Sequence, residues 1–230
     1  MKKKVTAIIA AGGSGKRMGF AMPKPFVKIA GRPLLFYSLD VFEKSNLIDS
    51  VVLVVARSCL KKTKGPLKKE SYKKLSTIVM GGSTRARSVY NGLCACRNSD
   101  IVLIHDVARP LLKQALIKRC VHSARKGINS LAAVPAKATI KNINLKNKYI
   151  LSTPERSSLW EAQTPQVFDK KVLVKAYAKL GNKAWKFKDD ASLVEACGGK
   201  VKVIQGDYSN IKITTKEDLR IAAALLRIKD

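Results

Sequence analysis

Short apolar runs alternate with segments of helical character along most of this chain. Five such runs are Val5 to Ile9, Val51 to Val55, Thr77 to Met80, Ile101 to Ile104 and Ser130 to Val134. The segments between them include Pro33 to Glu43, whose apolar residues recur at helical spacing behind a proline suited to the first helical position. Strands that alternate with helices in this way form a mostly parallel sheet with helices packed against it. The sequence therefore predicts a doubly wound α/β fold, with residues 1–230 forming a single domain.

The alternation changes between Ala136 and Pro154. Turn-forming residues from Asn142 to Lys148 separate two short runs there, Thr139 to Lys141 and Tyr149 to Leu151. Two short runs around a turn are typical of a β-hairpin. We expect this hairpin to protrude as an arm, and Thr164 to Phe168 to return the chain to the core.

The first apolar run leads into a glycine-rich loop, in which three of the four residues from Gly12 to Gly15 are glycine. Glycines let the backbone turn sharply and approach a ligand closely, and successive N–H groups in such a turn can bind phosphate oxygens. Arg17 and Lys24 add two cations. The spacing excludes a Walker A loop, and Met18 stands where a dinucleotide-binding fingerprint needs its third glycine. The loop therefore predicts a triphosphate-binding site of another kind.

Two further polar loops, Gly81 to Ser88 and His105 to Pro110, also follow predicted strands. Ligands of doubly wound sheets bind at the carboxyl ends of the strands, so we expect the three loops to form one crevice. Asp106 can accept hydrogen bonds from hydroxyl groups and Arg109 can bind an anion, which suits a sugar or polyol phosphate. The alternative is that these two residues only hold their loop. Lys212 has apolar neighbours, and we expect its ammonium to point into the crevice.

The net charge is +29, from 45 Lys and Arg against 16 Asp and Glu. Such a charge suggests an anionic partner, which could be nucleic acid, a membrane surface or a phosphorylated small molecule. Aromatic residues make up only 6% of the chain and do not interleave with the basic ones, so no base-stacking platform is indicated. The lysine-rich stretch Lys61 to Lys74 fits a loop or an exposed helix, and we interpret the excess charge as a solvated surface. Nucleic-acid binding stays open as the alternative from a different functional class.

Other features of the composition restrict the class of protein. No apolar run approaches the ~20 residues that cross a bilayer, and the apolar part of the N-terminus is too short for a signal peptide. The expected location is therefore cytoplasmic. The five cysteines are scattered and form no C-x-x-C pair, which favours reduced thiols over a metal site or a disulfide framework.

Seven motifs along the chain together resemble one known family. They are Gly13-x-Gly15-x-Arg17-Met18-Gly19, Pro23-Lys24, Gly81-Gly82-x-x-Arg85-x-x-Ser88-Val89, His105-Asp106-x-Ala108-Arg109-Pro110, Arg156-x-x-Leu159-Trp160-x-x-Gln163-Thr164-Pro165-Gln166, Asp189-Asp190-Ala191-Ser192 and Asn210-Ile211-Lys212. In this order they resemble the 2-C-methyl-D-erythritol 4-phosphate cytidylyltransferases of the non-mevalonate isoprenoid pathway. The resemblance extends over residues 5–226 and implies a nucleotide-diphospho-sugar transferase-like, Rossmann-like fold.

The resemblance also implies roles for particular residues. CTP would be held by Ala10, Ala11, Gly12, Gly13, Ser14, Gly15, Gly82 and Ser88. Arg17 and Lys24 would stabilise the charge of the transition state, and Arg156 and Lys212 would position the methylerythritol phosphate. The pocket for that substrate would be completed by Asp106, Arg109, Thr139 and Thr164.

The family is a homodimer, so the resemblance implies that residues 136–156 form a dimerisation arm and that Thr139 and Arg156 serve the neighbour's site. It also implies a Mg²⁺ ion bound mainly by the triphosphate. In the implied reaction a substrate phosphate attacks the α-phosphorus of CTP and expels pyrophosphate. A phosphomonoester has a second pKa of about 6 and is largely dianionic at neutral pH, so no general base is needed. We therefore expect His105 to be a structural hydrogen-bond donor.

Four positions depart from the family pattern: Pro25 for Gln, Ser83 for an acidic residue, Ala138 for Asp and Lys188 for Thr. They affect the contacts to the base and the edge of the polyol pocket. The nearest alternative is a ribitol-5-phosphate cytidylyltransferase, which shares the fold and most motifs. A sugar-nucleotide or cofactor guanylyltransferase is disfavoured because Arg156 and Lys212 would then lack their roles.

Overall fold

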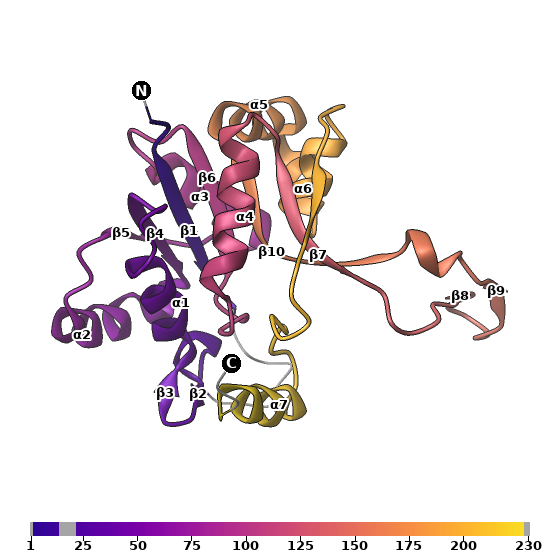
Figure 1. Ribbon diagram of the computed structural model, residues 1–230, viewed down its shortest axis with the longest axis horizontal. Coiled ribbons are helices and arrows are strands. Elements are labelled where there is room, and N and C mark those ends of the chain that lie inside the picture. Colours follow the sequence, from indigo (N-terminus) through magenta and orange to yellow (C-terminus); the bar gives the residue numbers. More distant parts are fainter. Residues whose placement is uncertain (1, 14–21, 228–230) are drawn as a thin grey trace.

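The computed structural model describes residues 2–13 and 22–227 of the chain, and its centre is a sheet of seven strands in the order β11-β7-β10-β6-β1-β4-β5. Those strands are β1 (Val5–Ala11), β4 (Ser50–Val55), β5 (Leu75–Met80), β6 (Ile101–Asp106), β7 (Ser130–Pro135), β10 (Trp160–Asp169) and β11 (Lys202–Gln205). All neighbouring pairs are parallel except those of β10, which runs antiparallel to both β6 and β7. The mostly parallel sheet predicted from the alternating runs is confirmed (Figure 1).

Helices cover both faces of this sheet (Figure 1). One face packs against α1 (Leu34–Glu43), α2 (Leu60–Glu70) and α4 (Gln114–Arg125), and the other against α3 (Arg85–Ala95), α5 (Lys170–Leu180) and α6 (Asp190–Glu195). Because side chains alternate along a strand, β1 sends Ala7 and Ile9 into the first layer and Ile8 into the second. Full burial of an isoleucine side chain such as Ile8 or Ile9 contributes about 1.5–3 kcal/mol. The doubly wound architecture is therefore built by strands buried on both faces.

The helix α3 lies close to the sheet because it carries Gly92. A Cβ at this position would stand 2.7 Å from Cγ2 of Ile8 and 2.8 Å from Cγ2 of Val54. The helix begins at Arg85 because Thr84 is its N-cap and accepts a hydrogen bond from the Arg87 N–H at 3.1 Å. This close packing sets the position of the loop that precedes the helix.

Short elements connect the layers. They are η2 (Lys24–Phe26), β2 (Lys28–Ile29), β3 (Arg32–Pro33), η3 (Arg57–Cys59), η4 (Arg156–Ser158) and η5 (Gly181–Lys186). The final helix α7 (Lys216–Arg227) packs through Ala222 against β2 and the start of α1, in a third small apolar cluster with Ile213. The residues just before α7 are thereby held against the main domain.

The arm predicted at residues 136–156 contains a two-stranded antiparallel sheet, β8 (Asn142–Ile143) with β9 (Ile150–Ser152). It projects from the main sheet between β7 and β10 (Figure 1). Five of its large apolar side chains are exposed, and these are Ile140, Leu145, Tyr149, Ile150 and Leu151. The hairpin is confirmed, and within the described residues these five apolar side chains are not covered by a core.

The cysteines form no disulfide bonds with one another. All five cysteines are free thiols, and Cys94 is exposed whereas Cys96 is buried. No helix in the described part of the chain has the length and apolar character needed to cross a bilayer.

Candidate active site

The carboxyl ends of β1, β5 and β6 meet at a cavity of about 440 Å³. Its lining consists of Ala10, Gly12, Gly13, Lys24, Gly82, Ser83, Thr84, Arg85, Ser88, Asp106, Val107, Ala108 and Lys212. These residues come from the three loops that the sequence predicts to converge, together with Lys24 and Lys212. The predicted crevice is therefore confirmed, and its volume lies within the range of small-molecule sites.

Glycines on one side of the cavity allow close packing against Ser88. A Cβ added to Gly81 would lie 2.9 Å from the Ser88 hydroxyl oxygen, and one added to Gly12 would lie 3.4 Å from it. The Ser88 hydroxyl accepts a hydrogen bond from the Gly82 N–H at 3.1 Å and is 2.9 Å from the Thr84 carbonyl oxygen, to which it donates. Ser88 thus fixes the loop whose glycine backbone faces the cavity.

Two lysines reach the cavity from different parts of the chain. Lys24 begins η2, and its Nζ donates to the carbonyl oxygen of Ile213 at 2.7 Å. Lys212 is the neighbour of Ile213, and its Nζ forms an ion pair with Asp106 Oδ2 at 2.6 Å. Both ammonium groups are therefore anchored beside the same short segment.

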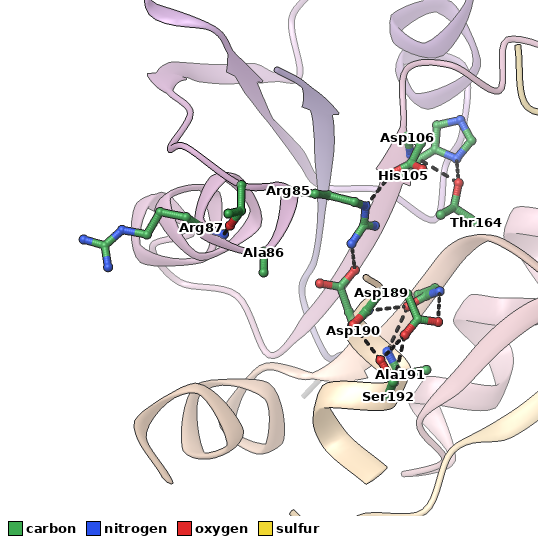
Figure 2. A network of polar contacts seen from close by, with 12 residues as sticks. Arg85, Ala86, Arg87, His105, Asp106, Thr164, Asp189, Asp190, Ala191 and Ser192 are labelled. Carbon is green, nitrogen blue, oxygen red and sulfur yellow. Dashed lines mark hydrogen bonds and ion pairs between the residues drawn. The ribbon is translucent and has the colours of Figure 1, made fainter. Parts of the chain in front are cut away.

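Asp106 is held by two cations, one on each carboxylate oxygen. Arg85 Nε donates to Asp106 Oδ1 at 2.9 Å, and Arg85 Nη1 donates to Oδ2 of Asp190 at 2.9 Å. Figure 2 shows the Arg85 guanidinium between these two carboxylates. Burial disfavours the charged form of Asp106, but Arg85 and Lys212 outweigh it and hold the pKa of this carboxyl well below its ordinary value. Burial raises the pKa of Asp190, and the opposing effect of Arg85, its cation partner among the described residues, does not outweigh it.

Behind Asp106, the buried ring of His105 links the loop to β10. Its Nε2 lies 3.0 Å from the carbonyl oxygen of Arg109, and because a carbonyl only accepts, Nε2 carries the proton. The Nδ1 atom then accepts from the Thr164 hydroxyl at 2.9 Å, and the same hydroxyl oxygen accepts from the Asp106 N–H at 3.2 Å. Burial lowers the pKa of His105 to about 4, so the ring is neutral at pH 7. This arrangement matches the structural role expected for His105.

The depressed pKa of His105 predicts a loss of stability in acid. The unfolded chain has a histidine pKa of about 6.5, whereas the folded protein has a His105 pKa of about 4. As the pH falls from about 6.5 to about 4, the unfolded state gains a proton that the folded state does not bind, so the unfolding free energy decreases. At pH 5 the linkage amounts to roughly 2 kcal/mol of unfolding free energy. Denaturant unfolding at pH 7 and pH 5 measures this difference in unfolding free energy. His105→Gln, which does not titrate, should remove most of that difference, and an undiminished difference in this variant would contradict the assignment.

A family model described as 2-C-methyl-D-erythritol 4-phosphate cytidylyltransferase matches residues 5–228. The chain belongs to this family. A protein of that name from Alkaliphilus metalliredigens is 42% identical over 225 residues, which cover 97% of this chain and 93% of the relative. The assignment favours the predicted nucleotidyltransferase over the nucleic-acid-binding alternative.

Solved structures of the cytidylyltransferase family share the fold. The 4-diphosphocytidyl-2C-methyl-D-erythritol synthase from Anaerococcus prevotii superposes with a TM-score of 0.85 at 35% identity, covering 98% of this chain and 97% of that one. The 2-C-methyl-D-erythritol 4-phosphate cytidylyltransferase from Thermus thermophilus gives a TM-score of 0.80 at 28% identity, covering 98% and 100%. The predicted fold class is confirmed.

The structure brings together part of the residue set that the cytidylyltransferase resemblance implies. The cavity contains Ala10, Gly12, Gly13, Lys24, Gly82, Ser88, Asp106 and Lys212. Ala11 is the buried last residue of β1 and precedes the glycines. Ser14, Gly15 and Arg17 lie outside the described residues.

Two residues predicted to bind substrate form hydrogen bonds inside the protein. Arg109 is buried, and its guanidinium donates to the carbonyl oxygens of Asn210 at 2.6 Å and Ala162 at 3.0 Å. It lines a neighbouring cavity of about 230 Å³ that shares Lys212 with the first. The Thr164 hydroxyl is likewise buried and holds His105 and the Asp106 N–H. In this structure both residues shape the walls behind Asp106, and their predicted contact with the polyol phosphate stays a prediction.

Thr139 and Arg156 lie on the arm and are exposed. Arg156 Nη1 donates to the carbonyl oxygen of Lys137, at the opposite root of the arm, at 3.2 Å. The structure of one chain therefore does not bring these two residues to the cavity lined by Lys24 and Lys212.

Sequence reasoning assigned no role to Arg85 or Asp190, although both occur in the quoted motifs. The position of Arg85 could have indicated such a role. A cation in the first turn of a helix is disfavoured by the helix dipole, so its presence there indicates acidic groups that pair with it. Here two carboxylates do so.

Proposed function

We propose that this chain condenses CTP with 2-C-methyl-D-erythritol 4-phosphate to give 4-diphosphocytidyl-2-C-methyl-D-erythritol and pyrophosphate. The observation that carries the proposal is the family match over residues 5–228, in a chain whose glycine loops and lysines surround one cavity. The cytoplasmic location stays a prediction.

The reaction forms a bond between an oxygen of the substrate phosphate and the α-phosphorus of CTP, and it breaks the bond from that phosphorus to the departing pyrophosphate. Two polyanions must approach, so catalysis depends on alignment and on neutralising charge. We assign Lys24 and Arg17 to the charge that develops on the phosphates, and Lys212 to the phosphate of the polyol. The backbone of Gly12, Gly13 and the neighbouring loop residues would hold the nucleotide. No proton acceptor is required of His105, whose ring nitrogens are both engaged.

We propose that Mg²⁺ enters with CTP as part of the substrate. Both carboxylate oxygens of Asp106 are engaged by Arg85 and Lys212. Within residues 2–13 and 22–227 no group of three or more His, Cys, Asp or Glu side chains is placed to hold a metal. The residues of the cavity therefore do not fit a metal held by the protein alone, whereas a triphosphate supplies its own oxygen ligands.

We propose that the arm pairs two copies of the chain. Its exposed apolar side chains, among them Leu145 at 78% and Tyr149 at 73% exposure, form the kind of patch that marks an interface. In such a homodimer Thr139 and Arg156 would reach the neighbour's cavity, which explains why they lie away from their own. Each protomer would remain a single domain with the 136–156 arm as its dimer contact.

Arg156→Ala is expected to weaken use of the polyol phosphate more than use of CTP. Loss of a charge-assisted hydrogen bond to a phosphate costs about 1.5–3 kcal/mol, or about 10–100-fold in KM. Steady-state kinetics with each substrate varied in turn measure the effect. Arg97→Ala removes the same charge from an exposed position near the amino ends of the strands and should change neither KM. An unchanged KM for the polyol phosphate in Arg156→Ala would contradict the role.

Mixed dimers test whether the arm crosses between chains. When Lys24→Ala and Arg156→Ala chains are mixed and allowed to exchange, about half of the dimers contain one of each. One of the two sites in such a dimer then has both residues, so about a quarter of the wild-type activity should return. No recovery in a sample shown to contain mixed dimers would contradict a crossing arm.

Pyrophosphate release from CTP tests the proposed function itself. The enzyme should release pyrophosphate with 2-C-methyl-D-erythritol 4-phosphate and much more slowly with ribitol 5-phosphate at the same concentration. Faster turnover of the ribitol compound would replace the proposed substrate by the nearest alternative, and no release with either would refute both.

A further inference from the structure

Four charged side chains of alternating sign run from the buried helix α6 to the mouth of the cavity. In order they are Asp190, Arg85, Asp106 and Lys212, joined by ion pairs of 2.9, 2.9 and 2.6 Å. The two ends of the series differ in exposure, since the side chain of Asp190 is 1% exposed and that of Lys212 is 42% exposed. The inner end is therefore fixed in the core, and the outer end faces the substrate.

The inner end of the series is held rigidly by the backbone of α6. The side-chain oxygen of Gln166 accepts hydrogen bonds from the N–H groups of Asp190 and Ala191, both at 3.0 Å. Asp189 caps the helix by accepting from the Ser192 N–H at 3.0 Å (Figure 2). Since Gln166 belongs to β10, the backbone of Asp190 is tied to the central sheet.

The outer end depends on Arg85 in two ways. Its Nε occupies Asp106 Oδ1, which leaves Oδ2 as the oxygen that meets Lys212. Its charge also brings the net charge of the four groups to zero, so the ammonium of Lys212 is not outweighed by the two carboxylates when a phosphate approaches. Without Arg85 the remaining three groups would carry a net charge of −1, beside a site that must admit two polyanions.

We propose that Arg85 is a positioning residue of this site: it orients the Asp106 carboxylate and, through it, keeps the Lys212 ammonium placed for the polyol phosphate. The inference rests on the proposed function. Arg85 also begins α3, the helix that carries Ser88 on the nucleotide side of the cavity, so it connects the two halves of the site.

Kinetic comparison of Arg85→Gln with Arg87→Gln tests this role. Arg87 lies two residues further along α3 and points away from Arg85 and Asp106 (Figure 2), with its guanidinium 4.5 Å from the centre of the Trp185 ring. Both variants lose one positive charge from the same helix. Arg85→Gln should raise the KM for 2-C-methyl-D-erythritol 4-phosphate about 10–100-fold and lower kcat, with less than about a threefold change in the KM for CTP. Arg87→Gln should leave all three constants within about twofold of wild type.

Arg85→Lys keeps the charge but not the planar fork, so its KM for the polyol phosphate should lie between those of wild type and Arg85→Gln. If Arg85→Gln does not fold, the KM of Arg85→Lys tests the positioning role instead. The positioning role would be overturned if a folded Arg85 variant kept the wild-type KM for the polyol phosphate and differed only in a lower melting temperature or a smaller active fraction. The proposed function would survive that result. A wild-type enzyme that releases no pyrophosphate would instead overturn the proposed function, and this inference with it.

Discussion

Lys24→Ala is expected to lower kcat for pyrophosphate release by about 10²–10³-fold, the typical cost of removing one preorganised group that stabilises transition-state charge. Lys24 lies at the end of the cavity lined by Gly12 and Gly13, with its Nζ anchored on the Ile213 carbonyl oxygen at 2.7 Å. The ammonium is thus directed before the nucleotide arrives, so little reorganisation is needed during the reaction. Assays of pyrophosphate release at saturating concentrations of both substrates measure kcat.

The matched control for this prediction is Lys28→Ala, which removes the same charge from an exposed position in the adjacent strand β2. It should retain nearly full turnover. Far-UV circular dichroism should show that both variants keep the native secondary structure. A folded Lys24→Ala enzyme with near-normal kcat would remove this residue from the mechanism.

Asp106→Ala is expected to lower the unfolding free energy by about 3 kcal/mol, because it removes the carboxylate from a buried ion-pair series and leaves cations uncompensated. Arg85 would retain Asp190 as a partner, while Lys212 is half-exposed and can be hydrated, so the loss should lie at the lower end for buried pairs. The rate of pyrophosphate release should also fall, because Lys212 would lose its ion pair with Asp106. Urea unfolding at pH 7 measures the free energy.

Glu70→Ala provides the contrast for Asp106→Ala. Glu70 pairs with Arg32 at 3.3 Å, but both side chains are more than a third exposed. Exposed pairs contribute about 0–1 kcal/mol, so this variant should be nearly as stable as wild type. Equal stability losses in the two variants would show that burial of the Asp106 pair has no energetic consequence.

The sequence predicts the sheet and the crevice well, because strands buried on both faces appear as continuous apolar runs and loops at their carboxyl ends must converge. It does not predict that β10 runs antiparallel to β6 and β7. The direction of that strand depends on how the arm returns to the sheet, which is a long-range property. The lysine-rich segment that became α2 stayed undecided because so few apolar residues mark its buried face.

The spacing of Asp106 and Arg109 predicts a pair of substrate ligands, but it does not predict the contacts that the Arg109 side chain makes inside the protein. The Arg109 N–H donates to the Asp106 carbonyl oxygen at 2.9 Å, which closes a tight turn. The Arg109 side chain then satisfies the carbonyl oxygens of Asn210 and Ala162, more than 50 residues further along the chain. Such distant partners leave no local pattern. Arg85 escaped assignment for the same reason, because its acid partners lie 21 and 105 residues away.

A crystal structure of the enzyme with CTP and Mg²⁺ tests the central claim most directly. The triphosphate should lie in the glycine-lined cavity, with phosphate oxygens about 2.7–3.2 Å from the N–H groups of the loop at Gly12 and Gly13 and from Lys24 Nζ. The cytosine should lie on the side of the cavity formed by Gly82 and Ser88. Nucleotide bound at another surface, or bound here with Lys24 turned away from its phosphates, would contradict the account.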